Sequence, residues 1–322
     1  MDRKKSALLA AGLALAMALH VSAAEIVQEK ALRAGAARDT NAIAFSPDGS
    51  LVASAHRQNE VKIWSVADGK EVASLKTFRD QPVSLAFAPD GTKLAATAPD
   101  ELMVRLFSVP DGKEIKAFKT SGKMLSVSIS PDGKLLAAAG RGKEFRLYSL
   151  PDGAEVKVVP AAHGSAITAL AFAPGGTLLA TASVDQTVKL WSVPEGAAVR
   201  TLSGHKDDVN ALAWSSDGER LLSGSEDETM IVWSAADGAV VRTLKGDNKD
   251  NIRAVALSKD GKLAFCGGNK DKKVRVFSVA DGAQQTSLTG HGKEVGALAF
   301  SSDGRTLASG GDDGSVLLWS VK

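Results

Sequence analysis

Three sets of four residues combine the side chains that hydrolases use for nucleophilic catalysis. Each set has a histidine, a serine or threonine, an aspartate four residues after that hydroxyl, and a tryptophan six residues after the aspartate. The sets are His163, Thr181, Asp185 and Trp191; His205, Ser223, Asp227 and Trp233; and His291, Ser309, Asp313 and Trp319. A hydroxyl, an imidazole and a carboxylate that meet in one pocket could form the triad of an acyl-transfer enzyme.

The repetition of these sets argues for a structural role. A triad needs one exposed nucleophile in one pocket, whereas these groups recur along the chain and each set ends in a tryptophan that can donate a hydrogen bond. We therefore interpret them as structural networks and predict no catalytic residue. Outside these sets and the first 24 residues, His56 is the one remaining histidine, so we also predict no metal site.

Composition narrows the cofactors and partners further. The single cysteine, Cys266, excludes an intramolecular disulfide and any cysteine-rich metal or haem motif, and its apolar surroundings predict a buried side chain. No glycine-rich phosphate loop precedes a helix, so no cofactor is expected. The formal net charge of +2 is too small to attract nucleic acid. A basic run, Lys270, Lys272, Lys273 and Arg275, is interpreted as a solvated outer face.

A turn tetrapeptide divides the chain into seven units. Most copies read Ser or Ala, Pro or Ser, Asp and Gly, and successive final glycines are 42 or 43 residues apart. The copies lie at residues 46–49, 88–91, 130–133, 173–176, 215–218, 258–261 and 301–304. Serine can cap such a turn, proline presets φ, and glycine accepts the left-handed conformation. Each tetrapeptide therefore predicts a β-hairpin.

Each unit contains a second turn about 20 residues later, such as Asp68-Gly69, and short β-type runs such as residues 51–54 and 61–64. Four short strands at this period predict an all-β, seven-bladed β-propeller with antiparallel blades. The seventh unit ends after its third strand, so residues 25–32 are expected to supply the missing strand and close the ring. The predicted domain is residues 25–322, a monomeric ring.

The third strand of every unit ends in an aromatic residue followed by serine, as in Trp64-Ser65, and Gly-His precedes two units. This pattern resembles the WD-repeat family of β-propellers over residues 25–322. The resemblance implies that each His, Ser or Thr, Asp and Trp set forms a hydrogen-bonded tetrad in blades four, five and seven. Blade one departs from the pattern, with Ala36 at the histidine position and Gln58 at the aspartate position. Blades two, three and six are also incomplete, which predicts weaker internal ties there.

The first 24 residues have the features of a bacterial secretory signal peptide. Charged residues at positions 2–5 precede an apolar stretch from Ala7 to Leu19, and small residues follow it. Cleavage is expected after Ala23 or Ala24, which leaves a periplasmic or secreted protein with no membrane insertion. Removing Arg3, Lys4 and Lys5 with Asp2 leaves 36 basic and 36 acidic residues, from totals of 39 and 37, so the mature chain is formally neutral.

The resemblance also implies a function. WD-repeat propellers most often bind protein partners on the face formed by the loops before the first strand and between the second and third strands. The positions that match this face are Asp39, Asn41, Arg57, Lys123, Arg141, Asp208, Asn210, Glu226, Asn251, Arg253, Lys270, Glu294 and Asp312. We expect a non-catalytic scaffold that binds a protein of the cell envelope. The alternative is an enzyme, or a small-ligand or metal binder, that uses the central channel.

Overall fold

The structure, a computed structural model, describes residues 25–33, 39–150, 152–246, 251–268, 270 and 272–322. The predicted signal peptide, residues 1–24, and Ala36 lie outside the described residues. Among the residues described, no helix has the length and hydrophobicity that a membrane crossing requires. One short 3-10 helix, η1 (Pro99–Glu101), interrupts a chain of β-strands.

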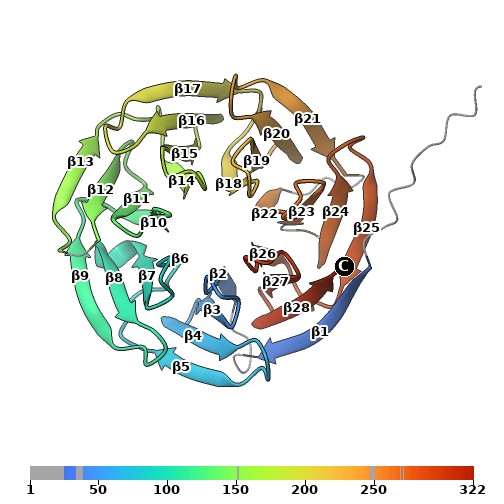
Figure 1. Cartoon of the computed structure of the whole chain (residues 1–322), viewed down its shortest axis with the longest axis horizontal. Helices are drawn as coiled ribbons and strands as arrows, with labels where there is room; N and C mark the ends of the chain where they lie inside the picture. The colour runs from blue at the N-terminus through green and yellow to red at the C-terminus, as the bar shows by residue number, and fades with distance from the viewer. Residues whose placement is uncertain (1–24, 34–38, 151, 247–250, 269, 271) are drawn as a thin grey trace, which may run out of the picture.

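Seven four-stranded antiparallel sheets stand side by side in a ring, with the first strand of each innermost (Figure 1), as the repeats predict. Blades one to three contain β2 (Thr40–Phe45), β3 (Leu51–His56), β4 (Glu60–Ser65), β5 (Glu71–Leu75); β6 (Ser84–Phe87), β7 (Lys93–Ala98), β8 (Met103–Ser108), β9 (Glu114–Lys119); β10 (Met124–Ile129), β11 (Leu135–Gly140), β12 (Phe145–Ser149) and β13 (Glu155–Val159). Blades four and five contain β14 (Ile167–Phe172), β15 (Leu178–Ser183), β16 (Thr187–Ser192), β17 (Ala198–Ser203); β18 (Val209–Trp214), β19 (Arg220–Ser225), β20 (Thr229–Ser234) and β21 (Val240–Lys245). Blades six and seven contain β22 (Ile252–Leu257), β23 (Leu263–Gly268), β24 (Lys273–Ser278), β25 (Gln284–Thr289); β26 (Val295–Phe300), β27 (Thr306–Gly311), β28 (Ser315–Val321) and β1 (Ile26–Arg33).

The two ends of the described chain close the ring in blade seven. Strand β1 pairs antiparallel with β28, from Ile26 opposite Val321 to Arg33 opposite Ser315. The backbone amide of Lys322 donates to the carbonyl of Glu25 at 3.2 Å, which extends the ladder to its end. This pairing confirms the predicted closure and covers the strand edge that β28 would otherwise expose.

The repeated tetrapeptides are the turns between first and second strands. In blade one, the Gly49 amide donates to the Ser46 carbonyl at 2.9 Å, and Gly49 has a φ of 72°, which glycine adopts without steric cost. The Ser46 hydroxyl donates to Asp48 at 2.6 Å and accepts from the Leu51 amide at 2.9 Å. The Ser46 hydroxyl, with the Ser50 amide and hydroxyl, lowers the pKa of Asp48.

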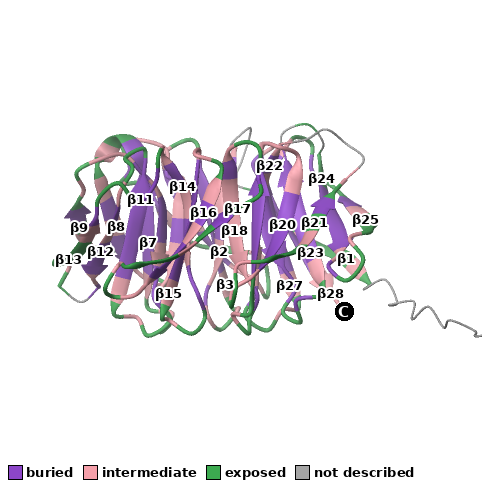
Figure 2. Cartoon of the chain, turned by 90° about the horizontal axis from the view of Figure 1, so that it is seen from above, coloured by how far each residue is buried: buried purple, intermediate pink, exposed green. Residues whose placement is uncertain are grey.

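The hydrophobic core lies between neighbouring blades (Figure 2). Second strands are almost entirely buried and rich in small residues, such as Ala137, Ala138 and Ala139 in β11. Small side chains there allow adjacent sheets to pack closely at the narrow, inner part of each blade. Cys266 in β23 is 2% exposed, which confirms its predicted burial.

The outer strands of blades two, four, five and seven are tied to the next blade. Basic side chains on these strands donate to backbone carbonyls in the third-to-fourth-strand turn of the neighbouring blade. The donors and acceptors are Lys30 to Val66 and Ala67, Lys116 to Asp152, Arg200 to Ala236 and Asp237, and Arg242 to Ala280. Positive charge on the outer wall therefore stabilises the contact between blades.

The outer-face interpretation of the basic run fails at one position. Lys270, Lys272 and Lys273 are exposed, but Arg275 is only 5% exposed in β24. Strand alternation puts Lys273 and Arg275 on the same face of the blade, but Lys273 lies at the strand end whereas Arg275 lies deeper, where the adjoining blade covers that face.

We predict that the closing strand contributes to global stability through Leu32. This side chain is 2% exposed and joins the cluster that contains Ile43 and Trp64 of blade one. Leu32→Ala should lower the free energy of unfolding by about 2–5 kcal/mol. On the same strand, Val27→Ala should change it by less than about 0.5 kcal/mol, because Val27 is 46% exposed. Urea denaturation of both variants checks this, and equal effects would contradict closure by β1.

Candidate functional site: the loop face and the central channel

The topology places two classes of loop on one face of the ring, here called the loop face. The tetrapeptide turns and the third-to-fourth-strand turns lie at one end of the antiparallel strands. The connections between blades and between second and third strands must therefore lie at the other end. All thirteen residues that the sequence predicts for partner binding lie in or directly beside these connections.

The His, Ser or Thr, Asp and Trp sets lie directly beneath the loop face. In blade four, His163 Nε2 lies 2.7 Å from Thr181 Oγ1, and its Nδ1 lies 2.9 Å from Asp185 Oδ2. Trp191 Nε1 donates to the same Thr181 hydroxyl at 2.8 Å. Asp185 also accepts from the Gly164 amide at 2.7 Å. The network thus links the loop before β14 to the loop before β16.

The same network recurs in blades five and seven. The histidine Nε2 to serine Oγ distance is 2.7 Å in both, from His205 to Ser223 and from His291 to Ser309. Trp233 and Trp319 each donate to that serine at 2.8 Å. The histidine Nδ1 to aspartate distance is 2.9 Å to Asp227 in blade five and 3.4 Å to Asp313 in blade seven.

The three hydroxyl groups at the centre of these networks have no access to a substrate. Thr181, Ser223 and Ser309 are each 0% exposed, and each hydroxyl contacts both a histidine and a tryptophan. A nucleophile must reach its substrate, so these groups act in folding and loop positioning.

Blade one contains a substitute network that the family pattern does not predict. Trp64 Nε1 donates to Ser54 Oγ at 2.8 Å, and His56 Nε2 lies 2.8 Å from the same oxygen. His56 is 0% exposed, and its Nδ1 lies 3.5 Å from Thr40 Oγ1. The histidine comes from the second strand instead of the loop before the first. One signal was present in the sequence: His56 is two residues after Ser54, so both point to one face of the strand.

Blade two replaces the polar network largely with an aromatic pair. The backbone amide of Arg79 donates to Glu101, as the Gly164 amide does to Asp185 in blade four. Phe78 thus occupies the histidine position, and its ring centroid lies 5.5 Å from that of Phe107. Arg105 bonds Glu101 and Glu114 at 2.6 Å each. Blade three has a similar bridge, in which Arg146 pairs with two glutamates, Glu144 and Glu155.

Three predicted face residues of blades five and six, Asn210, Glu226 and Asn251, form one polar cluster. The Asn210 amide donates to Glu226 and to the Ile252 carbonyl, and the Asn251 amide donates to Glu226, all at 3.3 Å. Asp208 lies beside this cluster, and its carbonyl accepts from the Glu226 amide at 2.8 Å. Burial, followed by the charges of Glu226 and Asp207, raises the pKa of Asp208. The carboxylates of blade five therefore repel one another.

The face residues of blade three carry the opposite charge. Lys123 forms an ion pair with Asp100 of blade two, and Arg141 is exposed. Lys123, together with Arg141, lowers the pKa of Asp100. Lys143 is also exposed beside them and belongs to the same basic patch, although the family positions do not include it.

Blades one, six and seven contribute internal ion pairs to the loop face. Arg57 donates to Asp39 at 2.8 Å, and Arg253 donates to Asp312 across blades six and seven at 3.2 Å. Burial raises the pKa of Asp312 although Arg253 opposes the shift, and the charges of Asp39 and Glu294 act in the same direction as burial. Lys270 is exposed in the connection between β23 and β24.

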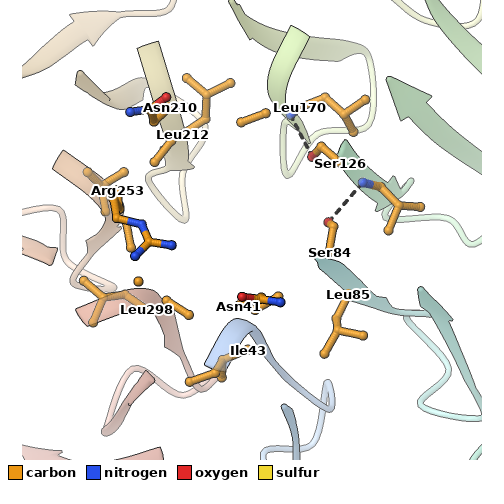
Figure 3. A pocket seen from close by; sticks show the side chains of 18 of the residues that line it. Asn41, Ile43, Ser84, Leu85, Ser126, Leu170, Asn210, Leu212, Arg253 and Leu298 are labelled. Carbon is orange, nitrogen blue, oxygen red and sulfur yellow. Dashed lines mark hydrogen bonds between the residues drawn. The ribbon is translucent and has the colours of Figure 1, made fainter. Parts of the chain in front are cut away.

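The central channel contains a cavity of about 320 Å³ lined by the first strands (Figure 3). Aliphatic side chains such as Ile43, Leu85 and Leu298 surround it, and Arg253 is the one charged residue in its described lining. Asn41 and Asn210 also line it, and Asn41 donates to the Pro82 carbonyl at 3.1 Å. Three predicted face residues thus extend the loop face into the channel.

A protein-family comparison now agrees with this geometry. The model for the WD domain, G-beta repeat, matches residues 33–65, 112–149, 154–192, 196–234, 238–278 and 282–320. The chain belongs to the WD-repeat family. The unmatched stretch, residues 66–111, contains the blade with Phe78 and Glu101 at tetrad positions, so its departure in sequence accompanies a departure in packing. No curated protein matches the chain in sequence.

We predict that the hydroxyl of blade one stabilises this WD-repeat ring as much as that of blade five. Ser54→Ala and Ser223→Ala each leave a buried histidine and tryptophan without a shared partner, so each should lower the free energy of unfolding by about 1–3 kcal/mol. Urea denaturation measures both. As a control, Ser50→Ala removes a hydroxyl from an exposed turn and should have a small effect. A negligible effect of Ser54→Ala would contradict the His56 network.

Stability should fall as the pH decreases. Burial lowers the pKa of His163 and His291 below 6.5, although Asp185 and Asp313 oppose the shift. Burial disfavours ionisation of Asp185, but bonds from Thr187 and Gly164 and the adjacent His163 hold its pKa at about 2. Between the ordinary pKa of each group and its lower pKa in the folded protein, the unfolded chain binds more protons than the folded chain. The free energy of unfolding therefore decreases first below about pH 6.5, where the histidines titrate, and again from about pH 4 towards 2, where Asp185 does.

Urea denaturation at about pH 7.5 and 5.5 tests the histidine contribution. The double variant His163→Gln and His291→Gln should show a smaller difference between these two conditions than the unchanged protein. Equal stability of the unchanged protein at both values would contradict the assignment.

Proposed function

We propose that this WD-repeat protein is a non-catalytic scaffold that binds a protein partner through its loop face. One observation carries the proposal. Every described strand belongs to a blade, and the three triad-like sets are buried structural networks. The charged and amide side chains of the loop face are the groups that a partner would contact.

The nature of these side chains supports a polar contact. The thirteen predicted residues include no aromatic residue, although aromatic anchors often dominate tight interfaces. Several of the thirteen are already held by neighbours, as Arg57 is by Asp39 and Glu226 by two asparagines. A partner therefore meets a preorganised surface, which reduces the entropy lost on binding.

We place this activity in the periplasm or outside the cell. The proposal rests on the signal-like residues 1–24 and the predicted cleavage after Ala23 or Ala24. The expected partner is accordingly a protein of the cell envelope. Expression of the full chain in a bacterium, followed by fractionation and N-terminal sequencing, tests this: an intact N-terminus in the cytoplasm would contradict export.

A small ligand in the channel is the competing function. The cavity of about 320 Å³ and its single guanidinium favour a small anion if any ligand binds there. Two observations weaken this alternative: Asp312 already pairs with Arg253, and no cluster of metal-ligating side chains occurs among the described residues.

Cross-linked capture from the native cell envelope tests the scaffold proposal. Arg57→Glu combined with Lys270→Glu reverses two exposed charges on the loop face and should reduce capture of a specific envelope protein at least about tenfold. Lys113→Glu reverses an exposed charge on the opposite face and should leave capture unchanged. Equal capture by both variants would overturn the loop face as the binding surface.

A further inference from the structure

The loop face carries opposite charges on the two sides of blade four. Blade three presents Lys123, Arg141 and Lys143, with Asp100 offsetting part of their charge. Blade five presents Asp207, Asp208 and Glu226, with the exposed Lys206 offsetting part of their charge. These two groups, here called the basic patch and the acidic patch, lie one blade away from blade four on either side, because the blades follow chain order around the ring (Figure 1).

The surface of blade four between the two patches carries little charge. Its loops, residues 160–166 and 184–186, carry one charged side chain, Asp185, which is engaged in the tetrad. The remainder includes small residues, with Gly164 exposed and Ser165, Ala166 and Val184 half-buried. A second protein surface can approach this blade closely without burying an unpaired charge.

This arrangement is complementary to itself. A two-fold axis that lies along the loop face and runs outward from the centre of the ring over blade four places two rings face to face. It exchanges blade three of one copy with blade five of the other, while blade four faces its own copy. Each basic patch then meets an acidic patch, and every such contact occurs twice, as in any isologous interface.

We propose that two copies of this protein associate weakly and reversibly through blades three, four and five of the loop face. The repulsion among the carboxylates of blade five supplies a physical reason, since an incoming guanidinium from Arg141 of a second copy would relieve it. The mature chain is formally neutral, with 36 basic and 36 acidic residues once residues 1–24 are removed from the totals of 39 and 37, so long-range repulsion between copies is small. This interaction goes beyond the scaffold function.

Sedimentation equilibrium of the purified protein tests the dimer. Arg141→Glu alone and Asp208→Lys alone should each weaken dimerisation at least about tenfold. The double variant restores opposite charges across the two-fold axis and should recover the dissociation constant to within about threefold of the unchanged protein. Raising the salt concentration to about 0.5 M should weaken the dimer of the unchanged protein, and Lys113→Glu should not alter it.

A cysteine on the axis provides a geometric test that does not depend on charge. Ser165→Cys lies on blade four and should meet the same residue of the second copy, so mild oxidation should yield a covalent dimer. Lys113→Cys on the opposite face should not, and the native Cys266 is buried. A monomer at all concentrations in low salt, or a double variant that fails to recover, would overturn the proposal. Capture of an envelope partner depends on the separate Arg57 and Lys270 variants, so the two proposals can fail independently.

Discussion

Every blade needs a neighbouring blade against each of its two faces. The rest of the structure depends on this constraint. A four-stranded sheet of short strands cannot bury its second and third strands by itself. Val52 and Leu94, in the second strands of blades one and two, are 0% exposed because an adjoining blade covers each of them. A chain of blades with two free ends would leave two such faces open to water. Closure by β1 removes both open faces together, so the first and last described residues matter to every blade.

A second constraint concerns the polar groups enclosed by this packing. A buried histidine, hydroxyl or indole N–H is costly unless it has a partner. Blades four, five and seven satisfy these groups with the family network, and blade one does so with His56 and Ser54. Blade two replaces most of the polar groups with Phe78 and Phe107 and adds an arginine bridge. Different side chains therefore meet one requirement, to hold two loops in place above a buried interior.

The buried networks beneath the loop face determine how its charges are arranged. Because its loops are anchored from beneath, the charges on it keep fixed relative positions. Some charges are neutralised within the chain, as in the pairs of Arg57 with Asp39 and Arg253 with Asp312. Others remain available, namely the acidic patch of blade five and most of the basic patch of blade three. The distribution of these charges, and not the net charge of the chain, determines which surfaces the ring can meet.

The sequence by itself determined the fold, the number of blades and the closing strand. These features follow from short-range patterns: turn residues at a regular spacing specify hairpins, and a recurring unit specifies a ring. The resemblance to WD-repeat propellers implied the three complete tetrads and the positions of the loop face. The tertiary structure decided which of those positions meet one another.

Only the tertiary structure showed that His56 completes blade one, that Arg275 is buried and that Asp208 lies among like charges. Each of these facts depends on strand register or on contact between different blades. His56 meets Ser54 on its own strand and Thr40 on the neighbouring strand, and Asp208 lies near Glu226 of another loop. These contacts depend on how the strands and loops align in space, which the repeat pattern does not record. The sequence repeat predicts the backbone of each blade, whereas packing between blades determines what surrounds each side chain.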